Sequence, residues 1–251
     1  MTGPEVPGSC PPVPGLSVVI PARNDAPALE RCLAALGRQT CPPLEVIVVD
    51  NGSVDATAAV AQRHGTLLLT EPRPGIAPAA TRGYDAARGH LIGRLDADSV
   101  PPPDWVHRMV AAIEAAGADA VTGTGRFYDG GPLARPVARL YLGSYYLLCA
   151  AALGHPPLWG SNMVLRRSAW ESARGRVHAD DPDVHDDLDL AFALGPHARI
   201  VVDRGPGVGV SARSVRGAAQ WRRRIGRARH TLSVNWRVQR PWERWQVRLA
   251  R

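Results

Sequence analysis

The chain has 251 residues, 45% of them hydrophobic and 21% charged, which excludes a disordered or fibrous protein and fits one large α/β domain or two small ones. The formal net charge is +7, yet residues 213–251 hold twelve Arg against one acidic residue, so the rest of the chain is net acidic. Residues 1–15 lack the features of a signal peptide, and Val137–Leu153, broken by Arg139 and Gly143, is expected to be too short and interrupted to span a membrane. We therefore expect a flexible leader at residues 1–15 and a soluble, cytoplasmic protein.

The first half of the chain alternates apolar runs with helical patterns. A β-branched run at Leu16–Ile20 ends at Pro21, and Glu45–Asp50 is apolar between its first and last residues, as in a strand buried on both faces. Further strands are expected at Thr66–Thr70, Leu91–Leu95 and Ala120–Thr124, with helices at about 27–36, 55–64, 78–88 and 102–116. This order predicts an α/β fold with a mostly parallel sheet flanked by helices.

The chain beyond Gly125 has a less regular pattern. An apolar helix is expected at about Leu133–Leu153, which either lines a groove or, as we prefer, belongs to the core. A strand-like piece follows at Trp159–Leu165, and then an acidic segment. Residues 212–251 are rich in Arg and Trp and are expected to form a basic helical segment that packs on or extends a domain at residues 16–211.

Carboxylates follow the ends of several predicted strands. Asp25 and Asp50 come after the first two strands, and Asp96 and Asp98 come after the strand at Leu91–Leu95. Ligands of open α/β sheets bind at the carboxyl ends of the strands, so these side chains are expected to converge on one edge. Two Asp at this spacing offer hard oxygen ligands to Mg²⁺ or Mn²⁺, although the same pair could merely open a loop and cap the next helix.

Five segments, taken in order, resemble the family 2 glycosyltransferases, a class with the GT-A fold that uses nucleotide-diphosphate sugars. These segments are residues 18–25, 48–55, 89–98, 160–167 and 185–190. The third of them is similar to the strand that carries the Asp-x-Asp metal motif of the family. The fifth is similar to its Glu-Asp-x-Asp-Leu motif, with Asp in place of the leading Glu. The resemblance covers about Leu16 to Ser211, so we expect a GT-A (Rossmann-like) fold.

The resemblance implies roles for residues at the matching positions. Asp98 would bind a Mn²⁺ or Mg²⁺ ion directly, with Asp96 near the ion and the ribose, while Asp25 and Asp50 would accept hydrogen bonds from the nucleobase or ribose. Arg213, in a Ser-x-Arg element, is a candidate for contact with the diphosphate, for which a guanidinium is suited. The full set of residues expected to bind the nucleotide or donor is Pro21, Arg23, Asp25, Asp50, Asn51, Ser53, Arg82, Asp96, Ala97, Asp98, Asn162 and Arg213.

A second acidic cluster carries the expected catalytic base. An inverting sugar transfer needs a carboxylate that removes the proton of the acceptor hydroxyl. The resemblance assigns this role to Asp187, with Asp186 as the second choice. Mutual repulsion among the neighbouring acids would raise one pKa and make a better base. The alternative is that these acids only occupy the positive end of a helix.

Two departures from the family pattern limit the assignment. Ala80 and Thr81 stand where the family has Arg and Asn, and Arg82 is shifted by two positions, so its contact with phosphate is an open question. Gln220 and the residues after it match only part of the motif of the processive synthases, and processive polymer synthesis is therefore not expected.

The sequence thus predicts a metal-dependent transferase that moves a single sugar from a UDP- or GDP-type donor to an acceptor hydroxyl, with inversion. The rivals are a non-catalytic nucleotide-sugar binder, which would not need the second acidic cluster, and a nucleotidyltransferase, for which the first loop lacks a glycine-rich phosphate site. The Arg- and Trp-rich tail matches no nucleic-acid-binding motif, and no nucleic acid partner is expected. The tail could instead lie on an anionic membrane, at its inner face, near a small-molecule or lipid-linked acceptor.

Overall fold

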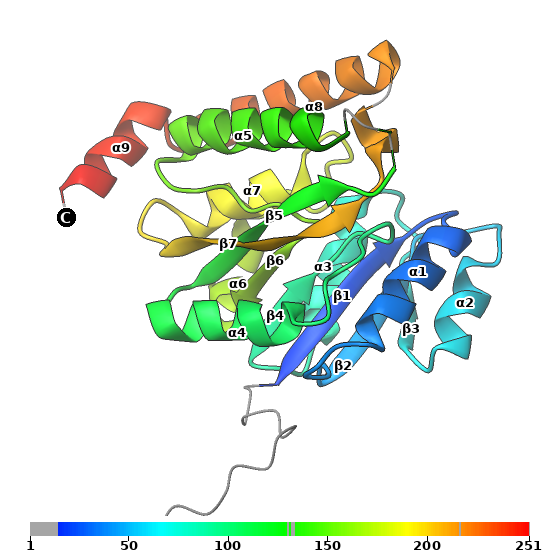
Figure 1. Ribbon diagram of the computed structural model, residues 1–251. Helices are drawn as coiled ribbons and strands as arrows, with labels where there is room; N and C mark the ends of the chain where they lie inside the picture. The colour runs from blue at the N-terminus through cyan, green and yellow to red at the C-terminus, as the bar shows by residue number, and fades with distance from the viewer. Residues whose placement is uncertain (1–14, 130, 132–133, 216, 251) are drawn as a thin grey trace, which may run out of the picture.

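A computed structural model describes residues 15–129, 131, 134–215 and 217–250, and the predicted leader at residues 1–15 falls almost entirely outside this part. Seven strands form a single sheet in the order β3-β2-β1-β4-β6-β5-β7 (Figure 1). All neighbouring strands are parallel except β6, which runs antiparallel to both β4 and β5. The strands are β1 (Leu16–Ala22), β2 (Glu45–Asp50), β3 (Leu67–Thr70), β4 (Leu91–Arg94), β5 (Ala120–Phe127), β6 (Met163–Arg166) and β7 (Ile200–Val210).

Helices cover both faces of the sheet because alternate strand residues point to opposite sides. Val18 and Ile20 of β1 belong to one apolar cluster, together with residues of α1, α2 and α4. Val19 belongs to the other cluster, together with residues of α3, α6 and α7. The helices are α1 (Ala26–Leu36), α2 (Thr57–Arg63), α3 (Ile76–Ala86), α4 (Trp105–Ala116), α5 (Ala134–Leu153), α6 (Arg167–Ala173), α7 (Asp186–Leu194), α8 (Ala218–Trp236) and α9 (Pro241–Leu249).

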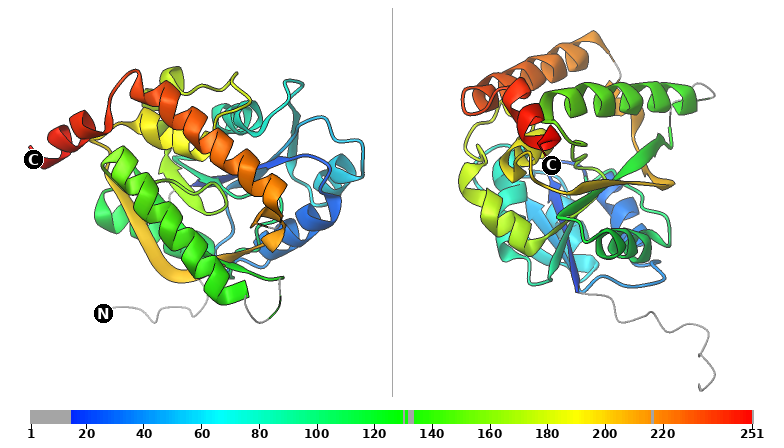
Figure 2. Two further views of the ribbon diagram at one scale, coloured as in Figure 1. Left: turned by 90° about the horizontal axis from the view of Figure 1, so that it is seen from above. Right: turned by 90° about the vertical axis from the view of Figure 1, so that its left-hand side faces the viewer.

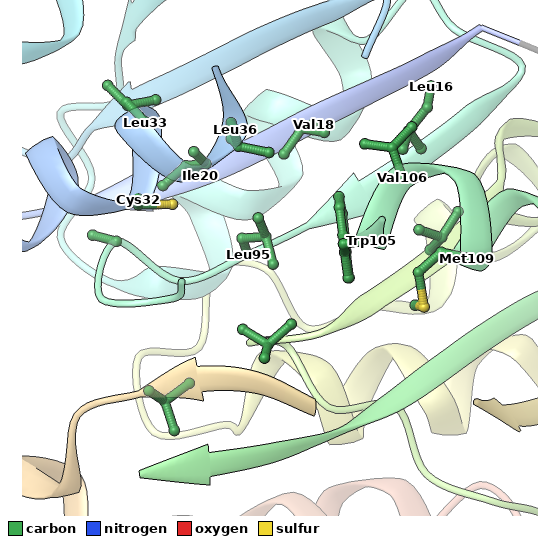
Figure 3. Close-up of a cluster of buried hydrophobic side chains, with 14 of the residues drawn as sticks. Leu16, Val18, Ile20, Cys32, Leu33, Leu36, Leu95, Trp105, Val106 and Met109 are labelled. Carbon is green, nitrogen blue, oxygen red and sulfur yellow. The ribbon is translucent and has the colours of Figure 1, made fainter. Parts of the chain in front are cut away.

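The first cluster fixes the strands that lead into the candidate site. Leu33 and Leu36 of α1 face the β1 side chains (Figure 3), while Trp105 of α4 packs against Gly93 of β4 and Met109 belongs to the same cluster. Trp105 is fully buried, and a side chain of this kind typically costs about 3–5 kcal/mol when truncated to Ala. Loops that leave β1 and β4 therefore start from a rigid base.

Two elements differ from the expectation for the second half of the chain. The strand-like piece near Trp159–Leu165 forms the antiparallel strand β6, which begins only at Met163. The eleven-residue strand β7 contains Gly205, Pro206 and Gly207, which are residues typical of turns, and the periodic pattern did not reveal it. The pairing of β5 with β7 shifts register between Gly123 and Gly125, so the extra residues of β7 form an irregularity within the strand.

The structure corrects the interpretation of α5 as a core helix. Only the side with Ala138, Leu142 and Leu153 is buried, whereas Leu140 and Leu147 are 76% and 72% exposed. The helix is also continuous through Gly143, and within the described residues its stretch Pro136–Leu153 is long and apolar enough to cross a membrane. By length and composition alone the segment therefore passes the test that it was expected to fail, which does not by itself show a membrane span. Here α5 packs along β5 and lies above the sheet (Figure 1).

Candidate active site

A cavity of about 660 Å³ opens at the carboxyl ends of β1 and β4. The loops after these strands form one wall, and α7 contributes a second. Helices α5 and α8 run side by side over the cavity (Figure 2), joined by the edge-to-face contact of Tyr141 with Trp221. Its principal polar lining residues are Arg23, Asp25, Arg94, Asp96, Asp98, Arg126, Ser161, His185, Asp186, Asp187, Ser211, Arg213, Gln220, Arg223, Arg224 and Arg227. The expected residues Pro21 and Ala97 also line it.

The loops after β1 and β2 are tied together by hydrogen bonds. Asn24, which has a positive φ of 51°, accepts a bond from the Val54 N–H at 2.8 Å, and its own N–H donates to Ser53 Oγ at 3.0 Å. Asp55 accepts bonds from the N–H groups of Ala26 and Thr57 and so caps the first turns of both α1 and α2. These contacts hold the backbone that presents Asp25 to the cavity.

Several residues expected at the nucleotide lie outside the cavity lining. Asp50 is buried and accepts a bond from the Ser53 N–H at 3.3 Å, so both residues shape the turn after β2. The Asn51 amide donates to the carbonyls of Glu71 and Arg73 and its oxygen accepts from Gly75 N–H, which gives Asn51 a role in the loop before α3. Direct contact of Asp50, Asn51 and Ser53 with a nucleotide stays a prediction.

Arg82 does not line the cavity. It lies exposed on α3, where its charge lowers the pKa of Glu71. Arg73 contributes more to that lowering, because its side chain donates to Glu71 at 2.9 Å. The expectation that Arg82 contacts the donor is therefore not supported by its position, which agrees with its shift from the family pattern.

Asn162, which was expected at the donor, is buried in the core and does not line the cavity. Its side chain is 0% exposed. The Oδ1 atom accepts a bond from Trp105 Nε1 at 2.8 Å, and Nδ2 donates to the Thr124 carbonyl at 2.9 Å. Both polar atoms of the amide thus make hydrogen bonds inside the core, and contact of Asn162 with the donor stays a prediction.

Arg94 joins the two acidic clusters. It is the last residue of β4 and only 1% exposed. Its Nη2 donates to Asp96 Oδ1 at 2.9 Å, and its Nη1 lies 3.0 Å from Asp186 Oδ2. A Cβ atom on Gly160 would lie 1.6 Å from Nη1, so the guanidinium fits only beside a glycine. The charge of Arg94 in an otherwise apolar strand was the signal in the sequence for this pairing, because a buried charge needs a partner.

Asp98 and Asp25 share a second guanidinium. Arg213, which follows β7, donates from Nη1 to Asp25 Oδ1 at 2.8 Å and from Nη2 to the other carboxylate oxygen. Its Nε lies 3.3 Å from Asp98 Oδ2. Burial and the nearby Asp96 carboxylate raise the pKa of Asp98 to about 6, and Arg213 opposes that rise. The structure thus brings together three of the residues predicted from distant parts of the chain.

The two acids at the start of α7 have different surroundings. Burial, opposed by Arg94 and reinforced by the neighbouring Asp187 and Asp96, raises the pKa of Asp186 to about 6. Asp187 accepts the Gly160 N–H at 2.9 Å and the Leu188 N–H at 2.8 Å. Both acids line the cavity. Asp186 therefore forms an ion pair with Arg94, whereas the hydrogen bonds of Asp187 within the described residues come from backbone N–H groups.

Helix α8 supplies a basic wall of the cavity, whereas the sequence placed this segment only at an anionic membrane. Arg223, Arg224 and Arg227 line the cavity opposite the acids. Arg224 also lies over the Tyr141 ring, with its guanidinium carbon 5.4 Å from the ring centre. The N–H of His185 donates to Thr231 Oγ1 at 2.8 Å, and its ring Nε2 lies 3.2 Å from the Arg224 carbonyl. Burial lowers the pKa of His185, which favours a neutral ring that donates to this carbonyl.

The residues at the Asp-x-Asp pair fit a divalent ion through Asp98. The two oxygens of Asp96 already accept hydrogen bonds from Arg94 and Ser161 Oγ, whereas Asp98 lines the cavity with its Oδ2 3.3 Å from Arg213 Nε. Among the described residues, no three His, Cys, Asp or Glu side chains are grouped so that they would hold a metal alone. This donor set suits Mg²⁺ or Mn²⁺, because such ions bind one or two carboxylates and complete their shell with phosphate oxygens and water.

The comparisons with known proteins give the family. A family model described as glycosyl transferase family 2 matches residues 17–173, more than half of the chain. The chain belongs to glycosyl transferase family 2. Relatives within this family include glycosyltransferase AglE of Haloferax volcanii, 35% identical over 123 residues, and an uncharacterized glycosyltransferase of Mycobacterium bovis, 38% identical over 111 residues. These matches take in 46% and 44% of the chain and 40% and 49% of the relatives, so the chain aligns with less than half of each curated relative.

Two solved structures share the fold. The mannosyltransferase PcManGT of Pyrobaculum calidifontis, in complex with GDP-Man and Mn²⁺, matches with a TM-score of 0.73 and 24% identity over 95% of this chain and 69% of its own. Glucosyl-3-phosphoglycerate synthase of Mycobacterium tuberculosis, in complex with Mn²⁺ and UDP-glucose, matches with a TM-score of 0.62 and 22% identity over 88% and 79%. The predicted GT-A fold, with a mostly parallel sheet flanked by helices, is confirmed.

Proposed function

We propose that this chain transfers a single sugar from a nucleotide-diphosphate sugar to an acceptor hydroxyl, with inversion at the anomeric carbon. One observation carries the proposal: the strand-end acids Asp25, Asp96 and Asp98 and the helix acids Asp186 and Asp187 line one cavity. A nucleotide-sugar binder without catalysis would not need the second pair. The GDP-Man and UDP-glucose bound by the structural neighbours support a UDP- or GDP-type donor.

The donor wall would bind the nucleotide-diphosphate. Asp98, supported by Asp96, would hold a Mn²⁺ or Mg²⁺ ion, which supplies charge stabilisation at the leaving diphosphate when it is bound. Arg213 is exposed over half of its side chain, so it can leave Asp25 and Asp98 and donate to diphosphate oxygens in a bidentate manner. Asp25 is then free to accept a hydrogen bond from the base or ribose.

The acceptor wall would carry the base. Asp187 would take the proton of the acceptor hydroxyl, because it lines the cavity, whereas Asp186 forms the ion pair with Arg94. Asp186 would keep Arg94 in place and so position Asp96 at the same time. The acceptor oxygen would then attack the anomeric carbon from the side opposite the diphosphate.

Donor binding is tested by thermal shift of the full chain with a panel of nucleotide-diphosphates and their sugars, with and without Mn²⁺. We expect one nucleotide to stabilise the protein only with the metal, and Asp98→Ala to abolish the shift. Asp203→Ala is the matched control, since Asp203 pairs with Arg108 outside the cavity. No metal-dependent shift from any nucleotide, or the same shift in Asp98→Ala, would refute the donor assignment.

Catalysis is tested by turnover with the donor that this panel selects. Asp187→Asn should keep the thermal shift and lower the release of nucleotide-diphosphate in the presence of acceptor extracts by at least 10²-fold, the usual contribution of a general base. A variant with unchanged turnover would show that Asp187 is not the base. Asp186→Asn, made in parallel, should lower the melting temperature, because it removes the partner of Arg94.

A further inference from the structure

The outer side of α5 carries an uncovered apolar stripe. Val137, Leu140, Leu147 and Leu148 are 46%, 76%, 72% and 68% exposed, and helical spacing places them on the side opposite to the residues packed on β5. Ser144 and Ala151 continue this side of the helix, and none of these six residues is charged. Single exposed apolar residues are ordinary, but a stripe along a twenty-residue helix marks a contact surface.

Helices α8 and α9 extend the stripe with Arg and Trp. Trp245 Nε1 donates to the Ala151 carbonyl at 2.8 Å and joins α9 to α5. Trp242 is exposed on α9, and Ile225 is exposed on α8. The whole of α8 contains no acidic residue, and Arg222 and Arg229 are exposed away from the cavity. We define the outer surface by Val137, Leu140, Leu147, Leu148, Arg222, Ile225, Arg229, Trp242 and Trp245.

We propose that the outer surface binds the face of an anionic lipid bilayer, with α5 and α8 lying parallel to the membrane. An apolar stripe flanked by Arg and Trp is the composition of an interfacial helix, in which Trp and Leu enter the headgroup boundary and Arg contacts lipid phosphates. The charge of the outer surface favours an anionic bilayer as the partner, because this surface is basic along α8 and uncharged along the α5 stripe. Since α5 also packs on β5, it lies on the membrane and does not cross it.

The position of the cavity makes this surface relevant to the acceptor. The inner sides of the same helices line the cavity, with Tyr141 and Leu142 from α5 and Arg223 and Arg224 from α8. A protein bound through the outer surface holds its cavity beside the lipid headgroups. Resting on the proposed function, this places the acceptor in the class of hydroxyl compounds anchored in the bilayer.

The test is flotation of the full chain with phosphatidylcholine vesicles that contain or lack phosphatidylglycerol, at low and high salt. We expect binding to the anionic vesicles at low salt and its loss at high salt, since salt screens exposed charges. The double variant Arg222→Gln/Arg229→Gln should lower the partition coefficient about thirtyfold, because each Arg near an anionic surface contributes about fivefold. Leu140→Gln/Leu147→Gln should lower it about tenfold or more through lost apolar contact.

Matched controls separate this surface from a general effect of charge or hydrophobicity. Arg38→Gln/Arg204→Gln removes the same charge from exposed residues on other parts of the fold, and Leu44→Gln/Val54→Gln replaces exposed apolar residues elsewhere. Both controls should float like the unchanged protein. Absence of binding to anionic vesicles at low salt, or equal binding by the outer-surface variants and the controls, would overturn the proposal.

Light scattering distinguishes a membrane from a second copy of the chain as the occupant. A dimer in solution that Leu140→Gln/Leu147→Gln dissociates would overturn the membrane proposal, whereas a monomer with intact flotation supports it. The thermal shift with nucleotides needs no vesicles. A failure of flotation with an intact nucleotide shift would therefore refute membrane contact and leave the proposed donor site standing.

Discussion

Replacement of Arg94 by Met should destabilise the fold strongly. The guanidinium is 1% exposed and lies within 3.0 Å of both Asp96 and Asp186. Met has a similar length but no charge, so two carboxylates are left near each other without a cation. Removing one partner of a buried pair costs about 3–5 kcal/mol. For a domain of this size that corresponds to a fall of about 6–20 °C in the melting temperature.

The loss of stability in Arg94→Met should be larger at high pH than at low pH. The pKa of Asp186 in the folded protein is about 6, above its ordinary value of 3.8, so the folded state binds more protons than the unfolded state between these values and stability falls as pH rises through that window. Without Arg94 the pKa of Asp186 rises further, because Arg94 lowers it in the unchanged protein. The loss in Arg94→Met should thus be larger at pH 8 than at pH 5.

Urea unfolding at both pH values measures this difference. Arg166→Met is the control, because Arg166 lies on the adjacent strand and pairs with Glu114 at 3.0 Å in a half-exposed position, where a pair is worth at most about 1 kcal/mol. Arg94→Lys should recover part of the loss, since an ammonium group reaches one carboxylate and not both. A deficit below about 1 kcal/mol at pH 8, or one that does not change between the two pH values, would refute the reasoning.

Three further changes have expected outcomes. Asn162→Ala leaves Trp105 Nε1 without its acceptor in the core, so the free energy of unfolding in urea should fall by about 2–4 kcal/mol. The affinity for nucleotide, measured by titration calorimetry on the folded fraction, should stay unchanged. A selective loss of affinity would show that Asn162 contacts the donor. Gly160→Ala inserts a Cβ 1.6 Å from Arg94 Nη1, so the melting temperature should fall as in Arg94→Met, and normal stability would contradict the packing described. Arg213→Ala should weaken nucleotide-diphosphate binding at least tenfold and leave free nucleoside binding unchanged, whereas equal losses for both would argue against a diphosphate contact.

The strands that position the site were predictable because their residues are apolar and β-branched. The runs at Leu16–Ile20 and Glu45–Asp50 predict buried strands, and the acids that follow them lie where these strands end. The burial of Asn162 was not predictable because its partner Trp105 lies 57 positions away, and a local pattern does not say whether an amide faces a cavity or the core. Strand β7 escaped prediction because its Gly and Pro residues are tolerated only through the register shift opposite β5.

The exposure of α5 could not be read from composition for a related reason. The sequence of an apolar helix is similar whether the helix is buried on all sides or exposed on one. Only the elements packed around Leu140 and Leu147 determine whether these side chains are exposed. Arg94, in contrast, was visible as a charge within an apolar strand, and its burial was inferable. Its partner Asp186 was not, because their contact joins segments 92 positions apart in the chain.

The cavity is built from two parts of the chain. Residues up to 173 hold Asp25, Asp96 and Asp98, whereas the acids of α7 and the Arg residues of α8 come later. Within the cavity these two parts are joined by Arg94 with Asp186, by the Gly160 N–H with Asp187, and by Arg213 with Asp25. Changes in α7 or α8 that keep these three contacts would alter the shape and charge of one wall of the cavity and leave the acids after β1 and β4 in place.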